Sequence, residues 1–134
     1  MKSISNQIIT NIRRGYYKYI GSGSCRKVYD LDNGYVVKVA NNRAGIAQNK
    51  AEYTISRHDY SNLFAKVTQV SNDFKFLIME KAEKINDISY VWDYFNVSNK
   101  RELFNIDELQ KIKKDYNLIL GDFGKTSSWG TING

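Results

Sequence analysis

Proline is absent from the 134-residue sequence, and cysteine and histidine occur once each. The single cysteine, Cys25, cannot form an intrachain disulfide, which fits a reducing compartment. The single histidine, His58, argues against a histidine-based metal site and a Ser-His-Asp triad, and we expect neither zinc nor haem. No apolar run reaches the length of a signal peptide or of a membrane span. We therefore expect a cytoplasmic protein without membrane contact.

Positive charge is in excess but scattered. Lysine and arginine number 20 against 14 acidic residues, which gives a net charge of +6. Such a balance favours anionic partners, and nucleotides, nucleic acid and acidic protein surfaces all remain open. The basic residues form only short clusters, at 13–14, 26–27 and 111–114, and no stripe or long arm. This scatter argues against nucleic acid as the partner.

The order of predicted elements indicates one small α+β fold. Ile4, Ile8 and Ile12 recur at four-residue spacing and predict an amphipathic helix over residues 3–14. The further elements that we predict are β-structure over 16–30, a hairpin turn at 32–34, a buried strand over 35–40, a loop over 41–45, a helix over 46–60, strands over 64–70 and 74–80 around a turn at 71–73, a mixed segment over 81–100, a helix over 106–116, and short strands at 118–120 and 129–132. The first five strands should form one antiparallel sheet with the helix of 46–60 packed on it. Residues 83–134 should form a short, reduced helical part, within one compact unit with residues 1–82.

A glycine-containing turn interrupts the first β-structure, at Gly21-Ser22-Gly23-Ser24. Glycines let the backbone approach phosphate oxygens closely and present N–H donors to them. Val28, four residues after the turn, would then pack on a flat base. A glycine pair in a hairpin is common, so this turn carries little weight by itself.

Lys38 lies in the middle of the apolar strand 35–40. A lysine inside a buried strand needs a partner, because an unpaired buried charge is costly. Glu52, near the centre of the following helix, can supply one. A lysine held in this way can reach the phosphates of a nucleotide. The alternative is a lysine that extends to solvent and an exposed helix glutamate.

The strand 74–80 ends in Met79-Glu80-Lys81-Ala82. Together with the glycine turn, Lys38 and Glu52, this segment resembles the hinge of protein-kinase-like proteins, in particular small bacterial and phage-type members. The resemblance covers residues 16–82 well and the remainder loosely. It implies a kinase-like N-lobe that binds ATP between the glycine turn and Met79, Glu80 and Ala82, with Mg²⁺ as the accompanying ion. If a phage encodes the protein, its location would be the host cytoplasm.

The chain departs from the family pattern at two places. Arg26 stands where the third glycine of the loop would be, and it could contact the phosphates or block them. No His-Arg-Asp sequence occurs. Asp122 in Asp122-Phe123-Gly124 has three interpretations: the metal-binding aspartate, the catalytic-loop aspartate with Ser127 in the place of the family's asparagine, or a turn residue. We favour the second, and under each interpretation only one of the two required aspartates is present.

The sequence ends in a β-like run followed by Asn133-Gly134, a strong hairpin signal with no strand after it. Either the chain is truncated or the strand pairs elsewhere, and an open strand edge invites a protein partner or self-association. We therefore expect a nucleotide-binding, kinase-like protein with weak or no phosphotransfer, a pseudokinase or a truncated kinase. The alternative is a phage or bacterial inhibitor module that binds a host protein without nucleotide, through the aromatic segment 90–95 or this edge.

Overall fold

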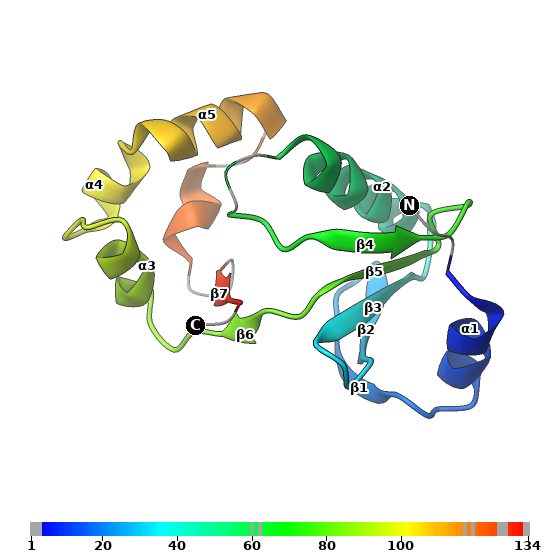
Figure 1. The fold of residues 1–134 in the computed structure, drawn as a ribbon. Coiled ribbons are helices and arrows are strands. Elements are labelled where there is room, and N and C mark those ends of the chain that lie inside the picture. Colours follow the sequence, from blue (N-terminus) through cyan, green and yellow to red (C-terminus); the bar gives the residue numbers. More distant parts are fainter. Residues whose placement is uncertain are drawn as a thin grey trace. The chain divides into compact units, whose positions relative to one another are not determined.

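The computed structural model describes residues 4–59, 61, 63–116, 118, 120–125 and 129–132 (Figure 1). The chain divides into two compact units, Met1–Lys81 and Ala82–Gly134. In the described part of the chain, no helix combines the length and the apolar character that a membrane crossing requires.

A five-stranded antiparallel sheet forms the centre of the first unit. Its strands are β1 (Lys18–Ser22), β2 (Arg26–Asp30), β3 (Tyr35–Ala40), β4 (Val67–Val70) and β5 (Phe76–Glu80). They lie in the order β1-β2-β3-β5-β4, so that β3 is the middle strand. The predicted α+β class, with one antiparallel sheet built from the first five strands, is confirmed.

The predicted turn at 32–34 connects β2 to β3. Asp32 and Gly34 both adopt positive φ, at 58° and 88°, and the Asp30 carboxylate accepts a hydrogen bond from the Asp32 amide at 2.8 Å. Aspartate and glycine are the residue types that tolerate this backbone region best. The turn fixes the antiparallel register in which Val28 lies opposite Lys38.

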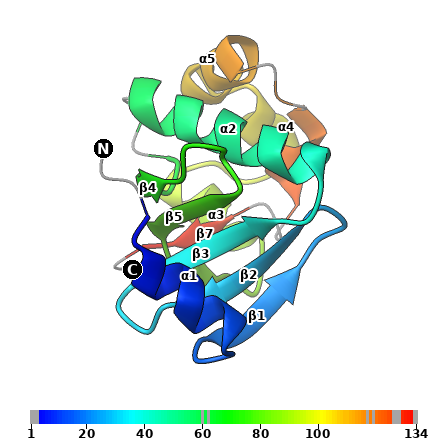
Figure 2. The same cartoon turned by 90° about the vertical axis from the view of Figure 1, so that its right-hand side faces the viewer.

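Helices cover both faces of the sheet (Figure 2). Successive residues of a strand point to opposite faces, and Val36 and Val37 of β3 accordingly belong to different cores. On one face, Val36, Leu77 and Met79 form a core that Tyr53 of α2 (Arg43–His58) contacts. On the other face, Val37 and Ile78 pack with Ile4 and with the isoleucines of α1 (Asn6–Arg13), namely Ile8, Ile9 and Ile12.

Helix α2 begins at Arg43, three residues before the predicted start at residue 46, and the loop predicted over 41–45 is wrong from Arg43 onwards. The Asn42 side chain caps the helix by accepting a hydrogen bond from the Gly45 amide at 3.0 Å. Gly45 lies in the first turn of this helix and is buried. A Cβ at this position would overlap the carbonyl oxygen of Cys25, so the glycine permits a close approach between the helix and the chain next to the glycine turn.

The second unit consists of short helices and a two-stranded sheet. Its elements are β6 (Glu83–Lys84), α3 (Ser89–Tyr94), α4 (Lys100–Phe104), α5 (Asp107–Tyr116), the 3₁₀ helix η1 (Leu120–Gly124) and β7 (Gly130–Thr131). Among its described residues, the buried apolar side chains are those of Val91, Leu103, Leu109 and Ile112. The predicted helix at 106–116 is confirmed as α5, whereas α4 has no counterpart among the predicted elements.

The strand predicted at 118–120 is wrong at Leu120, which begins η1, and Ile119 lies outside the described residues. A short apolar run has no periodicity that separates strand from helix, which explains the error. The strand predicted at 129–132 is present as β7, and it pairs with β6 through Glu83 opposite Thr131 and Lys84 opposite Gly130. One edge of β7 is thus paired within the chain. The predicted turn at 133–134 lies outside the described residues.

Candidate functional site

The structure brings Lys38 and Glu52 together as an ion pair. Lys38 Nζ lies 2.8 Å from Glu52 Oε1, and the two side chains are 20% and 28% exposed. Lys38 belongs to the face of β3 that also carries Val36, which is the face toward α2. The 16-residue helix carries Glu52 on the side that faces this strand. Glu52 is therefore the partner of the half-buried Lys38, as the sequence indicated.

Arg26 is a second cation at the same carboxylate. Its Nη1 donates to Glu52 Oε2, and its Nη2 donates to Glu52 Oε1 at 3.4 Å. The guanidinium also donates from Nη1 to Asn49 Oδ1 at 3.0 Å. The Arg26 side chain is 17% exposed, less than either partner of the lysine pair. Sequence reasoning placed Arg26 at the position of the third loop glycine of the family but missed this contact, because nothing in the spacing indicates it.

Two nearby cations keep Glu52 ionised. Burial has the largest single influence on this carboxyl and raises its pKa. The charge of Lys38 and the hydrogen bonds from Arg26 and Lys38 act in the opposite direction, and together they place the pKa of Glu52 below its ordinary value of 4.5. The carboxylate therefore carries its negative charge at neutral pH.

Asn49 is the residue of this site that the sequence did not reveal. It is fully buried, at 0% exposure, and lies one helical turn before Glu52. Its side-chain amide donates to the carbonyl oxygens of Phe74 and Lys75, at 2.8 Å and 3.2 Å, while its oxygen accepts from Arg26. Asn49 thereby connects Arg26 to the turn before β5. Asn49 precedes Glu52 by three residues on the helix, but nothing in the sequence indicates that its side chain is buried.

The predicted glycine turn, Gly21-Ser22-Gly23-Ser24, lies partly within β1, because Gly21 and Ser22 are the last residues of that strand, and only Gly23 and Ser24 belong to the connection to β2. The register of β1 shifts between Tyr19 and Gly21, and the Gly23 amide donates to the Arg26 carbonyl at 3.0 Å. A Cβ at Gly21 or at Gly23 would meet no atom within 4 Å, and neither residue has a positive φ. The chain's own packing thus does not require a glycine at either position. Val28 lies opposite Lys38 and packs against the core that contains Val36.

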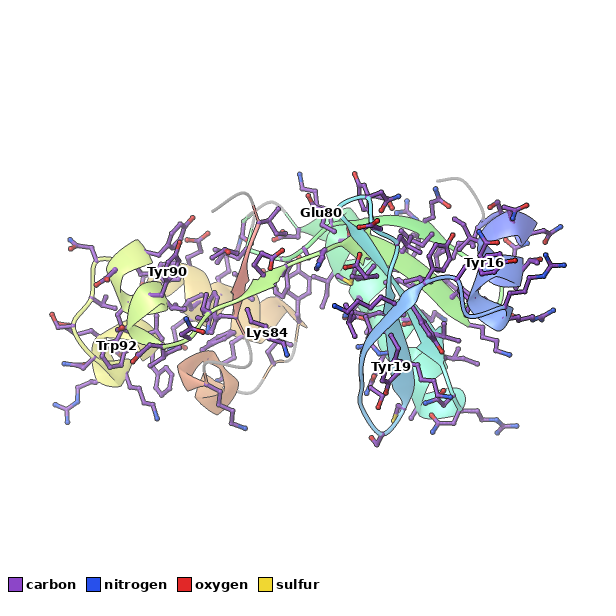
Figure 3. All side chains as sticks on the ribbon, turned by 90° about the horizontal axis from the view of Figure 1, so that it is seen from below. Tyr16, Tyr19, Glu80, Lys84, Tyr90 and Trp92 are labelled. Atoms are coloured by element: carbon purple, nitrogen blue, oxygen red, sulfur yellow. The ribbon has the colours of Figure 1, made fainter. Side chains whose placement is uncertain are left out.

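The predicted hinge begins in the first unit. Met79 is buried in the core, and Glu80 is the last residue of β5 (Figure 3). The backbone amide of Lys66 donates to Glu80 Oε1 at 2.8 Å, and the Glu80 amide donates to the Lys66 carbonyl at 2.9 Å. The Lys81 amide donates to the Gly34 carbonyl at 2.9 Å. Ala82 is the first residue of the second unit, and its Cβ lies close to Gly130.

Asp122 belongs to η1 in the second unit, but its side chain and the whole of Ser127 lie outside the described part of the structure. Its neighbours have packing roles. Trp129 Nε1 donates to the Phe123 carbonyl at 2.8 Å, and a Cβ at Gly124 would press against the side chains of Lys100 and Phe104. Among the residues described, no group of three His, Cys, Asp or Glu side chains could hold a metal ion. The predicted magnesium role of Asp122 stays a prediction.

No protein-family model and no curated protein matches the chain. Solved structures do match. A gentamicin complex of APH(2")-IIa and a ternary complex of streptomycin, ATP and APH(2")-IIa are each 23% identical to it, with a TM-score of 0.46 over 75% of this chain and 35% of theirs. The ADP-bound aminoglycoside phosphotransferase APH(2'')-Ib is 20% identical, with a TM-score of 0.47 over 72% of this chain and 34% of its own. This chain thus spans about a third of the length of these structures.

Proposed function

We propose that the chain is a kinase-like protein that binds a nucleotide, with ATP as the expected ligand, and has weak or no phosphotransfer activity. The ion pair between Lys38 and Glu52 is the observation that carries this proposal. The pair holds an ammonium group on the middle strand of the sheet, beside Val28 and next to the strand that begins after the glycine turn. A positioned cation of this kind is suited to bind the phosphates of a nucleotide.

The expected weakness of phosphotransfer follows from the side chains that this chemistry needs. Transfer of a phosphoryl group requires groups that hold the metal ion and a group that orients the nucleophile. The sequence offers one candidate for both tasks, Asp122, and lacks a His-Arg-Asp segment. Nucleotide binding needs only the cations, the glycine turn and an apolar surface for the base. We therefore expect the protein to bind a nucleotide and to show weak or no catalysis.

A thermal-shift titration with ATP, with and without Mg²⁺, tests the proposal. A ligand that binds only the folded state raises the midpoint of unfolding, by an amount that grows with its concentration. We expect a rise in the parent protein that Lys38→Ala abolishes and that Lys66→Ala leaves in place. Lys66 is a suitable control because it lies in the same unit and its side chain is exposed. No rise at millimolar ATP would refute nucleotide binding.

A second candidate function is an interaction module that binds another protein without nucleotide. Two tyrosines of α3 favour it, because Tyr90 and Tyr94 are 49% and 71% exposed (Figure 3 labels Tyr90). Exposed aromatic side chains are enriched where proteins bind one another. For this function, capture of one specific protein should be lost in Tyr94→Ala and kept in Lys38→Ala. Capture that depends on Lys38 and on added ATP would instead favour the nucleotide-binding function.

A further inference from the structure

The charge cluster around Glu52 has one more positive charge than negative charges. Arg26 and Lys38 both form ion pairs with Glu52, and in the described part of the chain neither cation forms an ion pair with another carboxylate. The third ion pair of the same unit is balanced, since Lys81 Nζ meets Asp30 Oδ2 at 2.8 Å. The unbalanced cluster is therefore a local feature of β2, β3 and α2, and one further anion would neutralise it.

We propose that Arg26 and Lys38 together form a subsite for a phosphate chain, with Glu52 as the anchor that both cations share. This inference rests on the proposed nucleotide binding and adds a residue to it. Arg26 is the first residue of β2, directly after the chain that follows the glycine turn, so that a guanidinium group lies at the start of this strand. The ligand class that fits is a di- or triphosphate, because two separate cations can contact successive phosphate groups.

Both cations retain hydrogen-bond donors for such a ligand. A lysine ammonium has three donors, and Lys38 uses one of them on Glu52 among the described residues. A guanidinium has five, and the bonds from Arg26 to Glu52 and Asn49 use only its Nη atoms. The Arg26 side chain is 17% exposed and the Lys38 side chain is 20% exposed, so a ligand can still contact both, although neither is fully hydrated. Charge-assisted hydrogen bonds gain strength in such surroundings.

Hydrogen bonds to Asn49 and Glu52 of α2 hold the Arg26 side chain in place. Asn49 Oδ1 and both oxygens of Glu52 accept from the guanidinium, and Asn49 itself is fixed by two backbone carbonyls. A side chain that is held in this way loses little rotamer freedom when it binds. Arg26 is thus preorganised as an anion-binding group, whereas a flexible surface arginine is not.

Isothermal titration calorimetry with ATP, ADP, AMP, adenosine and inorganic tripolyphosphate tests the proposal. We expect Arg26→Ala to weaken ATP and ADP about tenfold or more, the loss typical of one charge-assisted contact, and to leave adenosine unchanged. Arg26→Lys keeps the charge and should recover part of the lost affinity. Arg13→Ala removes an exposed arginine of the same unit and should have no effect. The unfolding midpoint of each variant shows that it is folded.

The outcomes separate this subsite from the proposed function. If the parent binds ATP and Arg26→Ala binds it equally well or better, the subsite is refuted while nucleotide binding stands. An equal loss for adenosine and ATP would also overturn it, because Arg26 would then act on the fold and not on phosphate. If the parent binds tripolyphosphate through Arg26 but no nucleotide, the subsite stands and the proposed function fails. Binding of neither ligand refutes both.

Discussion

Replacement of Asn49 by alanine should destabilise the first unit strongly, although the residue has no charge and lies on a helix. Its side chain is fully buried and makes hydrogen bonds to Arg26, to the Phe74 carbonyl and to the Lys75 carbonyl. Each such bond contributes about 1 kcal/mol net, and a buried group that loses its partner costs about 1–3 kcal/mol. Alanine favours a helix over asparagine by at most about 0.7 kcal/mol, which offsets little of this loss. We therefore expect a loss of about 2–3 kcal/mol in the free energy of unfolding.

Urea unfolding followed by far-ultraviolet circular dichroism measures this change. Trp92 and Trp129 both lie in the second unit, so tryptophan fluorescence reports on that unit separately. Gln48→Ala is the matched control, because Gln48 precedes Asn49 on the same helix and is exposed. Its effect should stay within about 0.5 kcal/mol. If Asn49→Ala were as stable as Gln48→Ala, the buried amide would not hold α2 to the turn before β5.

Asn49→Asp separates the two halves of the amide. The carboxylate still accepts a hydrogen bond from Arg26, but it has no donor for the carbonyls of Phe74 and Lys75 and places negative charge against them. We expect a loss of stability comparable to that of the alanine variant. A variant as stable as the parent would mean that the bond to Arg26 alone accounts for the role of Asn49.

Two further predictions concern the same helix. Gly45→Ala should destabilise the protein by about 1–3 kcal/mol in urea unfolding despite the better helix propensity of alanine, because the new Cβ would overlap the Cys25 carbonyl; a more stable variant would contradict this packing. Glu52→Gln should cost about 2 kcal/mol at neutral pH, between the values for exposed and buried ion pairs. Since folding lowers the pKa of Glu52 below 4.5, its contribution is complete above that pH and is lost as the pH falls through the lower folded value. The difference between parent and variant should therefore shrink in acid, and a difference independent of pH would refute the assignment.

The sheet could be predicted because its signals are local. The β-branched run of β3 and the turn at Asp32-Asn33-Gly34 are short-range patterns. Short connections also explain the antiparallel pairs β1-β2, β2-β3 and β4-β5, whereas the pairing of β3 with β5 spans α2 and β4. The pairing of Lys38 with Glu52 was also within reach, because a lysine in an apolar strand requires an anion nearby. These features depend on a few neighbouring residues or on one strong energetic requirement.

The remaining features depend on how elements dock, which no local pattern encodes. Gly45 resembles a loop residue in the sequence, yet it lies inside α2, where the absence of a Cβ lets the helix approach the Cys25 carbonyl. The contact of Arg26 with Glu52 depends on the register of β2 against β3, where Arg26 lies opposite Ala40, and on the position of the helix. A one-residue shift of that register would direct Arg26 to the other face of the sheet.

The same docking contacts explain why the cation cluster can be rigid. Gly45 allows the first turn of α2 to approach the chain beside the glycine turn, and the Asn41 amide donates to the same Cys25 carbonyl at 2.7 Å. One turn further along, Asn49 fixes the helix to the carbonyls before β5, and the next turn presents Glu52 to Arg26 and Lys38. Three successive turns of one helix thus contact the chain before β2, the turn before β5 and the side chains of β2 and β3. Because each contact restricts the same helix, the position of Glu52 relative to the two cations is set by backbone packing and not by flexible side chains alone.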